Sequence, residues 1–184
     1  VTSANRIEGV TTRSDIHAGV LSVDVKTART GSDRVCVTLL ADGKTLAERS
    51  SMAGQPVHLA VEHPRLWSPD DPYLYDLTVT LVRDGRVIDR AESYAALSEI
   101  ATGRDANGIE RMTLNGRPLF HFGPLDQGWW PDGLYTAPTD EALLYDIRFT
   151  KQLGFNMIRK HIKVEPERWY WHCDREGILV WQDM

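Results

Sequence analysis

The hydrophobic period of this sequence changes part-way along the chain, and that change constrains the fold more than any other feature. From about residue 6 to residue 100, apolar and polar residues alternate with a period of two, which is typical of strands that turn one face to a core. After about residue 103 the apolar residues follow a helical spacing, and each helical stretch leads into a short apolar run. The chain therefore contains two regions of different architecture.

The first region has the features of an all-β domain. Aspartate followed by glycine occurs at Asp42-Gly43 and again at Asp84-Gly85, and this pair suits tight hairpin turns in which both residues take positive φ. Because no helical stretch occurs here, the pattern predicts about six or seven short strands in a two-sheet, immunoglobulin-like sandwich over residues 1–100. The clearest alternation lies at residues 21–25, 35–39, 57–61 and 75–81.

The second region, residues 101–184, alternates strands with helices. Thr139 can cap a helix that ends at Gly154. Pro166 suits the first turn of a second helix and Gly177 suits its end. Since each helix separates two strand candidates, the strands are expected to be parallel. Three such units cannot close a (β/α)8 barrel, which needs about 250 residues, so an incomplete TIM barrel is predicted. The strand candidates are residues 119–123, 155–159 and 178–183.

Composition and charge exclude several classes of protein. The chain has 21 Lys and Arg against 26 Asp and Glu, and its basic residues are scattered, so no nucleic-acid-binding surface is expected. Its longest apolar runs, about five residues, fall far short of the roughly 20 that cross a bilayer, so no membrane role is expected. Cys36 and Cys173 belong to no metal-binding motif and are expected to be free, buried thiols. They slightly favour a cytoplasmic location and leave the compartment open.

Three segments resemble glycoside hydrolase family 2, which includes β-galactosidases, β-glucuronidases and β-mannosidases. The motif Leu-Trp-Ser-Pro-Asp-Asp-Pro-Tyr-Leu-Tyr at residues 66–75 resembles a segment of the family's sandwich domain, where Trp67 is expected to plug the end of the sandwich. Residues 114–120 resemble the hairpin that leads into the family's barrel, and residues 153–183 resemble its second and third barrel strands. One departure is Tyr94–Ser98, where many members have Tyr-Phe-Gly-Met-Arg, and this favours a divergent substrate.

The resemblance implies a fragment of a β-galactosidase-like, retaining β-glycosidase that acts on a neutral carbohydrate substrate, with galactoside or mannoside as the default candidates. Retaining enzymes use two carboxyl groups, and in this family these are glutamates at the ends of the fourth and seventh barrel strands. The first usually lies in an Asn-Glu pair, and this sequence contains none. No catalytic residue is therefore predicted in the chain, which should be inactive alone. The mechanism requires no cofactor, and no metal ligands are recognised.

Part of a sugar-binding pocket is predicted at the ends of the first two barrel strands, because barrel enzymes build their sites there. Asp126, Trp129 and Trp130 lie in a glycine-containing loop, where indole faces suit the C–H faces of sugars and a carboxylate can accept hydrogen bonds from hydroxyls. The alternatives are that the indoles pack the loop and that Asp126 caps a turn. The resemblance places Arg159, with Lys160 and His161, where the family holds its catalytic carboxylates and the sugar.

Asp183 ends the third strand candidate, in a run too apolar to be surface. An unpaired carboxylate there would be costly, so pairing with Arg159 or with a residue outside the sequence is expected, and Asp183 joins the predicted sugar-binding residues. Two rival hypotheses remain, namely a non-catalytic carbohydrate-binding or spacer module and a catalytically dead relative. Because an incomplete barrel leaves open strand edges and unpartnered helix faces, self-association into a homo-oligomer through residues 104–184 is also predicted.

Overall fold

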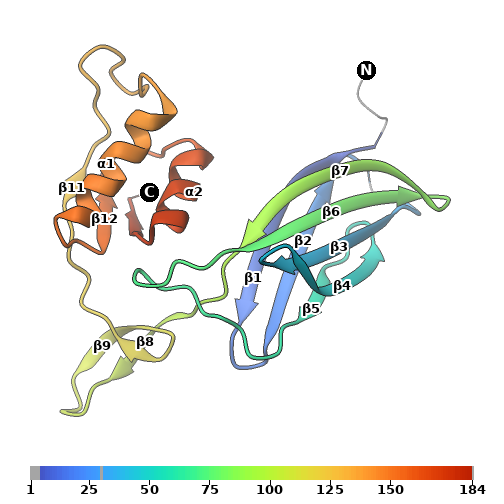
Figure 1. Cartoon of the computed structure of the whole chain (residues 1–184), viewed down its shortest axis with the longest axis horizontal. Coiled ribbons are helices and arrows are strands. Elements are labelled where there is room, and N and C mark those ends of the chain that lie inside the picture. The colour runs from blue at the N-terminus through green and yellow to red at the C-terminus, as the bar shows by residue number, and fades with distance from the viewer. Residues whose placement is uncertain (1–4, 30, 184) are drawn as a thin grey trace. The chain divides into compact units, whose positions relative to one another are not determined.

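The computed structural model describes residues 5–29 and 31–183, and the chain divides into two compact units. The first unit comprises the residues up to Leu66 together with Leu74–Ile100. The second comprises Trp67–Tyr73 and the residues from Ala101 onward. Strands alone form the first unit, whereas strands and two helices form the second (Figure 1).

The first unit consists of two antiparallel sheets, as expected for an all-β sandwich. One sheet has the strand order β1-β2-β5 and the other has the order β4-β3-β6-β7. Side chains that alternate along β2, β3 and β6 are almost completely buried, so the period of two in the sequence does mark core-facing positions. The strands are β1 (Ile7–Asp15), β2 (Val20–Thr27), β3 (Arg34–Ala41), β4 (Lys44–Met52), β5 (Val57–Ala60), β6 (Tyr75–Arg83) and β7 (Arg86–Ala95).

The predicted hairpin turns are confirmed by their backbone angles. Both residues of each turn take positive φ, which matches the twist of the flanking strands and is costly for most residues other than Asn, Asp and Gly. The φ values are 49° and 75° at Asp42-Gly43, 48° and 74° at Asp84-Gly85, and 53° and 74° at Asn115-Gly116.

The second unit contains a parallel sheet of order β11-β12-β13 and a small antiparallel sheet of order β10-β9-β8. Side chains from both helices pack with Ile158 and Ile178 into one buried cluster, so the helices cover one face of the parallel sheet. The strand–helix–strand–helix–strand order predicted from the sequence is confirmed. The elements are β8 (Ile100–Arg104), β9 (Glu110–Leu114), β10 (Arg117–Pro118), β11 (Leu125–Asp126), α1 (Asp140–Gln152), β12 (Met157–Lys160), α2 (Glu167–Glu176) and β13 (Leu179–Gln182).

The prediction of a strand at residues 119–123 is wrong. The first parallel strand is β11, which is two residues long and lies further along the chain. The backbone before it already lies beside β12, since Asn156 N–H donates to Phe122 O at 3.0 Å and Arg159 N–H donates to Pro124 O at 2.9 Å. Pro124 has no N–H to return a hydrogen bond, so a regular ladder forms only after it.

The helix ends follow the expected chemistry with one shift. Thr139 accepts a hydrogen bond from Ala142 N–H and caps α1, as predicted, and Gly177 ends α2 in a left-handed conformation. Pro166 lies at the N-cap position of α2 rather than within its first turn. Its fixed φ of −63° suits both positions, so the sequence could not distinguish them.

Trp67 does not plug the end of the sandwich, and that expectation is corrected. It belongs to the second unit, where it is 5% exposed and its Nε1–H donates to Asp174 O at 2.7 Å. Asn115 Nδ2 donates to Trp67 O at 3.0 Å, and Lys151 Nζ donates to Pro69 O at 2.7 Å. A segment that lies between β5 and β6 in sequence is therefore built into the second unit.

Both cysteines are free, but only Cys173 is fully buried, whereas Cys36 is half-buried. Burial raises the pKa of the Cys173 thiol, which keeps it protonated and unreactive. Within residues 5–29 and 31–183, no helix has the length and apolar character needed to span a membrane.

Candidate functional site

The carboxyl ends of the parallel strands bring Arg159 and Asp183 together. The guanidinium Nε and Nη2 of Arg159 donate to Oδ1 and Oδ2 of Asp183, both at 3.1 Å, so the predicted pairing of the two residues is confirmed. These hydrogen bonds hold the pKa of Asp183 below its usual value and raise the pKa of Arg159. The pair is thus ionised at neutral pH and is still partly open to solvent, with 47% of the Arg159 side chain and 28% of the Asp183 side chain exposed.

His161 and Gln127 extend this pair into a polar cluster. His161 N–H donates to Asp126 O at 2.8 Å, which continues the pairing of β11 with β12 and fixes the position of the imidazole. The ring Nδ1 lies 3.0 Å from Gln127 Nε2, and Nε2 lies 3.8 Å from Asp183 Oδ2. The four side chains present donors and acceptors at one edge of the sheet, and we call them the polar cluster: Gln127, Arg159, His161 and Asp183.

Lys160 does not join the polar cluster, because alternation along β12 turns its side chain toward the helices. The side chain is 1% exposed, and its Nζ donates to Asp126 Oδ2 at 2.5 Å and to Glu165 Oε1 at 3.0 Å. Nζ also lies 4.3 Å from the centre of the Trp169 ring. Lys160, which the sequence predicts to bind sugar, therefore lies in the interior of the second unit.

Asp126 is engaged through both carboxylate oxygens. While Oδ2 accepts from Lys160, Oδ1 accepts from Gly128 N–H at 2.7 Å, which caps the turn that follows β11. This geometry matches the turn-capping alternative, and it leaves the carboxylate with less capacity to bind a hydroxyl.

The two indoles of the loop lie in different surroundings. Trp129 is 53% exposed and its ring centre lies 4.4 Å from that of Tyr135. Trp130 packs against the buried cluster between the helices and the sheet, and its backbone pairs with Leu134. The indole Nε1 of Trp130 is buried and has no hydrogen-bond partner among the described residues. Trp129 is thus available to a ligand, whereas Trp130 packs the loop.

Three residues near the site were not predicted from the sequence: Lys163, Glu165 and Tyr135. Glu165 Oε1 accepts from Lys160 Nζ at 3.0 Å and forms an ion pair with Lys163 Nζ at 2.9 Å, and its side chain is only 3% exposed. The signal available in the sequence was the group of charged residues Lys160, Lys163 and Glu165, directly before a helix start at Pro166. Such a group of charges usually marks a solvated surface, so burial could not be expected from the sequence.

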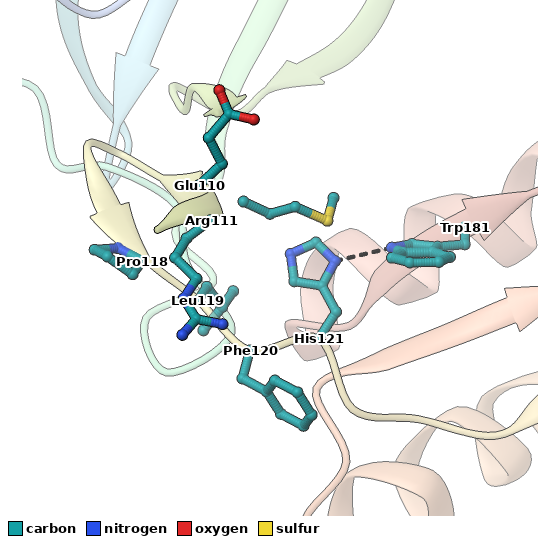
Figure 2. A pocket seen from close by; sticks show the side chains of 8 residues that line it. Glu110, Arg111, Pro118, Leu119, Phe120, His121 and Trp181 are labelled. Carbon is teal, nitrogen blue, oxygen red and sulfur yellow. Dashed lines mark hydrogen bonds between the residues drawn. The ribbon is translucent and has the colours of Figure 1, made fainter. Parts of the chain in front are cut away.

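A cavity of about 550 Å³ lies elsewhere in the second unit. Figure 2 shows His121 pointing toward Trp181, whose Nε1–H donates to His121 Nδ1 at 2.8 Å. Burial lowers the pKa of His121, so the imidazole is neutral and Nδ1 is free to accept this hydrogen bond. The sequence did not predict this cavity. It is lined by Glu110, Arg111, Met112, Pro118, Leu119, Phe120, His121 and Trp181.

Comparison with protein families decides the affiliation of the chain. The sequence profile of Glycosyl hydrolases family 2 matches residues 5–97, which is half of the chain and contains all the strands of the first unit. The chain belongs to this family. The motif at residues 66–75 lies inside the matched range, and the resemblance of the chain to this family is confirmed.

Individual relatives of this family 2 chain include proteins with different names. A "Beta-galactosidase" of Lactococcus lactis is 30% identical over 128 residues, which cover 69% of this chain and 12% of the relative. A "Putative beta-glucuronidase" of Formosa agariphila is 30% identical over 176 residues, or 90% of this chain and 16% of the relative. A solved family 2 structure from Bacteroides cellulosilyticus has a TM-score of 0.79 and 26% identity, over 97% of this chain and 26% of that one.

This family 2 chain therefore spans about an eighth to a sixth of the length of those curated relatives. Its similarity to the solved structure extends through both units, because 97% of the chain is covered. The polar cluster thus lies in a region whose fold recurs in the family.

Proposed function

We propose that this chain is part of a retaining β-glycosidase and forms one wall of its sugar-binding pocket. In this proposal the first unit is an immunoglobulin-like sandwich, residues 1–100, and residues 101–184 are the first three β/α units of a TIM barrel. Membership of family 2 supports the proposal, and so does the parallel order of β11, β12 and β13 with their connecting helices.

The observation that carries this proposal is the polar cluster at the carboxyl ends of the three parallel strands. In barrel enzymes the active site lies at that end of the strands. Asp183 and His161 can bind sugar hydroxyls, and the Arg159 guanidinium can keep a nearby carboxylate ionised, as it does for Asp183. Trp129 lies in the same loop, two residues after the cluster residue Gln127, and presents an exposed indole.

The proposed substrate is a neutral β-glycoside, with β-galactoside as the first candidate. The name of the Lactococcus relative supports it. The charges support it too, because each cation near the cluster already faces a carboxylate: Arg159 faces Asp183, Lys160 faces Asp126 and Glu165, and Lys163 faces Glu165. A uronide, suggested by the name of the Formosa relative, would need a further cation for its carboxylate.

Within the proposed enzyme this chain binds and orients, and it does not itself break the glycosidic bond. A retaining mechanism needs an acid and a nucleophile about 5–5.5 Å apart. Asp183 is held by Arg159, and Asp126 is held by Lys160 and Gly128, so neither is placed to fill these roles. The two catalytic glutamates of the family are expected in the longer protein.

Hydrolysis of 4-nitrophenyl glycosides tests the proposal. The 184-residue chain should release no nitrophenol from the β-D-galactoside or the β-D-glucuronide, whereas the longer natural protein should hydrolyse the galactoside with retention at the anomeric carbon. A longer protein that hydrolyses neither would favour a binding or spacer module or a dead relative. Turnover by the chain alone, or preference of the longer protein for the glucuronide, would contradict the proposal.

A further inference from the structure

Two exposed aromatic rings meet in the loop between β11 and α1. The ring centres of Trp129 and Tyr135 lie 4.4 Å apart with an angle of 35° between the planes. The two side chains are nonetheless 53% and 46% exposed, so each ring contacts the other and keeps a large open surface. Exposed aromatic rings in contact are costly to leave in water unless something else binds them.

Lys163 fixes the two backbone points from which these rings project. Its Nζ donates to Gly128 O at 2.9 Å, directly before Trp129, and to Tyr135 O at 2.8 Å. The same nitrogen pairs with Glu165 Oε1 at 2.9 Å and lies 5.3 Å from the centre of the Tyr135 ring. With a side chain only 8% exposed, Lys163 acts as an internal tie between the two ends of the loop.

Lys163 is itself held by a buried chain of alternating charges that begins at Asp126. Lys160 links Asp126 to Glu165, and Glu165 links Lys160 to Lys163. Carboxylates and ammonium groups alternate along this series, which offsets the cost of burying Lys160, Glu165 and Lys163. Gly128 fits against this series of ion pairs because it has no Cβ. A Cβ there would lie 2.7 Å from Lys163 Nζ and would also collide with Glu165 Oε1.

We propose that Trp129 and Tyr135 form a stacking platform for the C–H face of a pyranose ring, and that Lys163 is the positioning residue of this platform. This proposal rests on the proposed function, in which the polar cluster binds sugar hydroxyls. The loop lies next to that cluster, because Gln127 at its start contacts His161. A pyranoside is the ligand of choice because it combines an apolar ring face for the indole with hydroxyls for the polar cluster. A rigid platform also loses little conformational freedom on binding.

The chain contains a second exposed aromatic pair that serves as a control. Tyr145 and Phe149 on α1 have ring centres 6.0 Å apart and are 65% and 48% exposed. They are one helical turn apart, so their proximity follows from the helix alone and requires no tie. If exposed aromatic rings in general bound sugars, this pair would respond as well.

Binding can be measured on the 184-residue chain by titrating its 15N-labelled tryptophan indoles with methyl β-D-galactopyranoside. We expect the indole resonance of Trp129 to shift saturably, and not with galactitol, which has the hydroxyls but no ring. Tyr135→Ala should abolish this shift, while Tyr135→Phe and the control Tyr145→Ala should retain it. Trp129→Ala removes the reporting indole, so its binding is read from the remaining tryptophan indoles, which should not respond to the glycoside. Equal shifts with galactitol, a response to phenol but not to the glycoside, or binding by Trp129→Ala would overturn the platform.

Lys163→Met tests the positioning role, because it keeps an unbranched side chain of nearly the same length and removes the N–H donors. We expect affinity for the glycoside to fall by about fivefold or more, since a loosened loop must be ordered on binding. Amide exchange at Trp130 and Leu134, whose N–H groups close the loop, should accelerate while exchange in the first unit stays unchanged. Lys44→Met, at an exposed site in the first unit, is the control. Unchanged loop exchange and affinity in Lys163→Met would show that Lys163 does not position the platform.

The two proposals fail in different ways. If the 184-residue chain binds the glycoside at the platform but the longer protein hydrolyses no glycoside, the proposed enzyme activity is contradicted and the platform is supported. Hydrolysis by the longer protein with an unaltered KM in Trp129→Ala would leave the enzyme standing and sink the platform.

Discussion

In the first unit the large exposed apolar residues are aliphatic, such as Leu46 and Val87, and aliphatic side chains fill most of the core. In the second unit the described residues include exposed Phe, Tyr and Trp rings, while Lys160 and Glu165 are almost fully buried. The first unit follows the ordinary distribution of apolar groups, although it too buries a carboxylate, Asp33, which pairs with Arg83. The second unit departs from the ordinary distribution in both directions.

This contrast shows where the chain contains features that contribute little to its folding stability. Buried charges that pair with one another contribute little net stability, and exposed aromatic rings contribute less than buried ones. Both features occur around the strand ends of the second unit, where the polar cluster and the aromatic pair lie. A unit that only had to fold would be expected to resemble the first.

Replacing Trp67 tests whether its segment belongs energetically to the second unit. Trp67→Ala should destabilise that unit by about 5 kcal/mol, because it removes a buried indole and its hydrogen bond to Asp174 O. Hydrogen exchange should accelerate in α2 and β13 and remain slow in β2, β3 and β6. Acceleration confined to the first unit would mean that the contrast between the units is drawn in the wrong place.

Breaking the buried charge chain is the next largest perturbation. Lys160→Met should destabilise the second unit by about 3 kcal/mol, because it removes the cation that faces the buried carboxylate of Glu165 and the partly exposed carboxylate of Asp126. The matched variant in the first unit is Arg13→Met, which breaks an exposed pair with Asp24 and should cost less than about 1 kcal/mol. Equal costs in urea unfolding of the two variants would refute the distinction.

Self-association should depend on the second unit alone. Leu125, Arg159 and Trp181 are neighbours across the parallel sheet and all three are exposed, so this row is the proposed contact between copies. Leu125→Lys should weaken association by roughly a hundredfold, because an unpaired charge is costly to bury. Light scattering against the control Val87→Lys, which changes an exposed residue of the first unit, measures this effect. A monomeric 184-residue chain without substitutions would contradict the proposal.

Arg159 should matter for catalysis in the longer protein. Arg159→Ala is expected to lower kcat by at least about tenfold, because one lost charge-assisted hydrogen bond costs roughly 1.5–3 kcal/mol. Steady-state kinetics with the nitrophenyl galactoside provide the measurement, and Arg13→Ala, in an exposed pair of the first unit, is the control. A kcat equal to that of the natural protein would reassign Arg159 to a structural ion pair.

The smallest expected effect concerns the glycines with positive φ. Gly43→Ala should cost only about 1 kcal/mol, since nothing lies within 4 Å of the added Cβ and the penalty is that of the left-handed backbone. Gly128→Ala should cost more, because its Cβ would also displace Glu165 and Lys163. Thermal unfolding of both variants would show whether the loop glycine is distinguished by its packing, and equal losses would argue that it is not.

Local chemistry by itself determined much of this protein. The turn at Asp42-Gly43, the cap at Thr139 and the stop at Gly177 could be predicted because each depends on the φ preference or side-chain oxygen of one or two residues. The two periods of the sequence likewise separated an all-β region from a parallel one, since a strand and a helix expose different sets of positions to a core.

Tertiary structure alone decided which of the chemistry-bearing residues face one another. Arg159 and Lys160 are adjacent in sequence, yet one meets Asp183 in the polar cluster and the other is buried against Asp126 and Glu165. Likewise, Trp67 lies between two strands of the first unit but packs in the second. Burial and pairing depend on groups far apart in the chain, and a charge pattern such as residues 160–165 is the same on a solvated surface as in an interior where its ions balance.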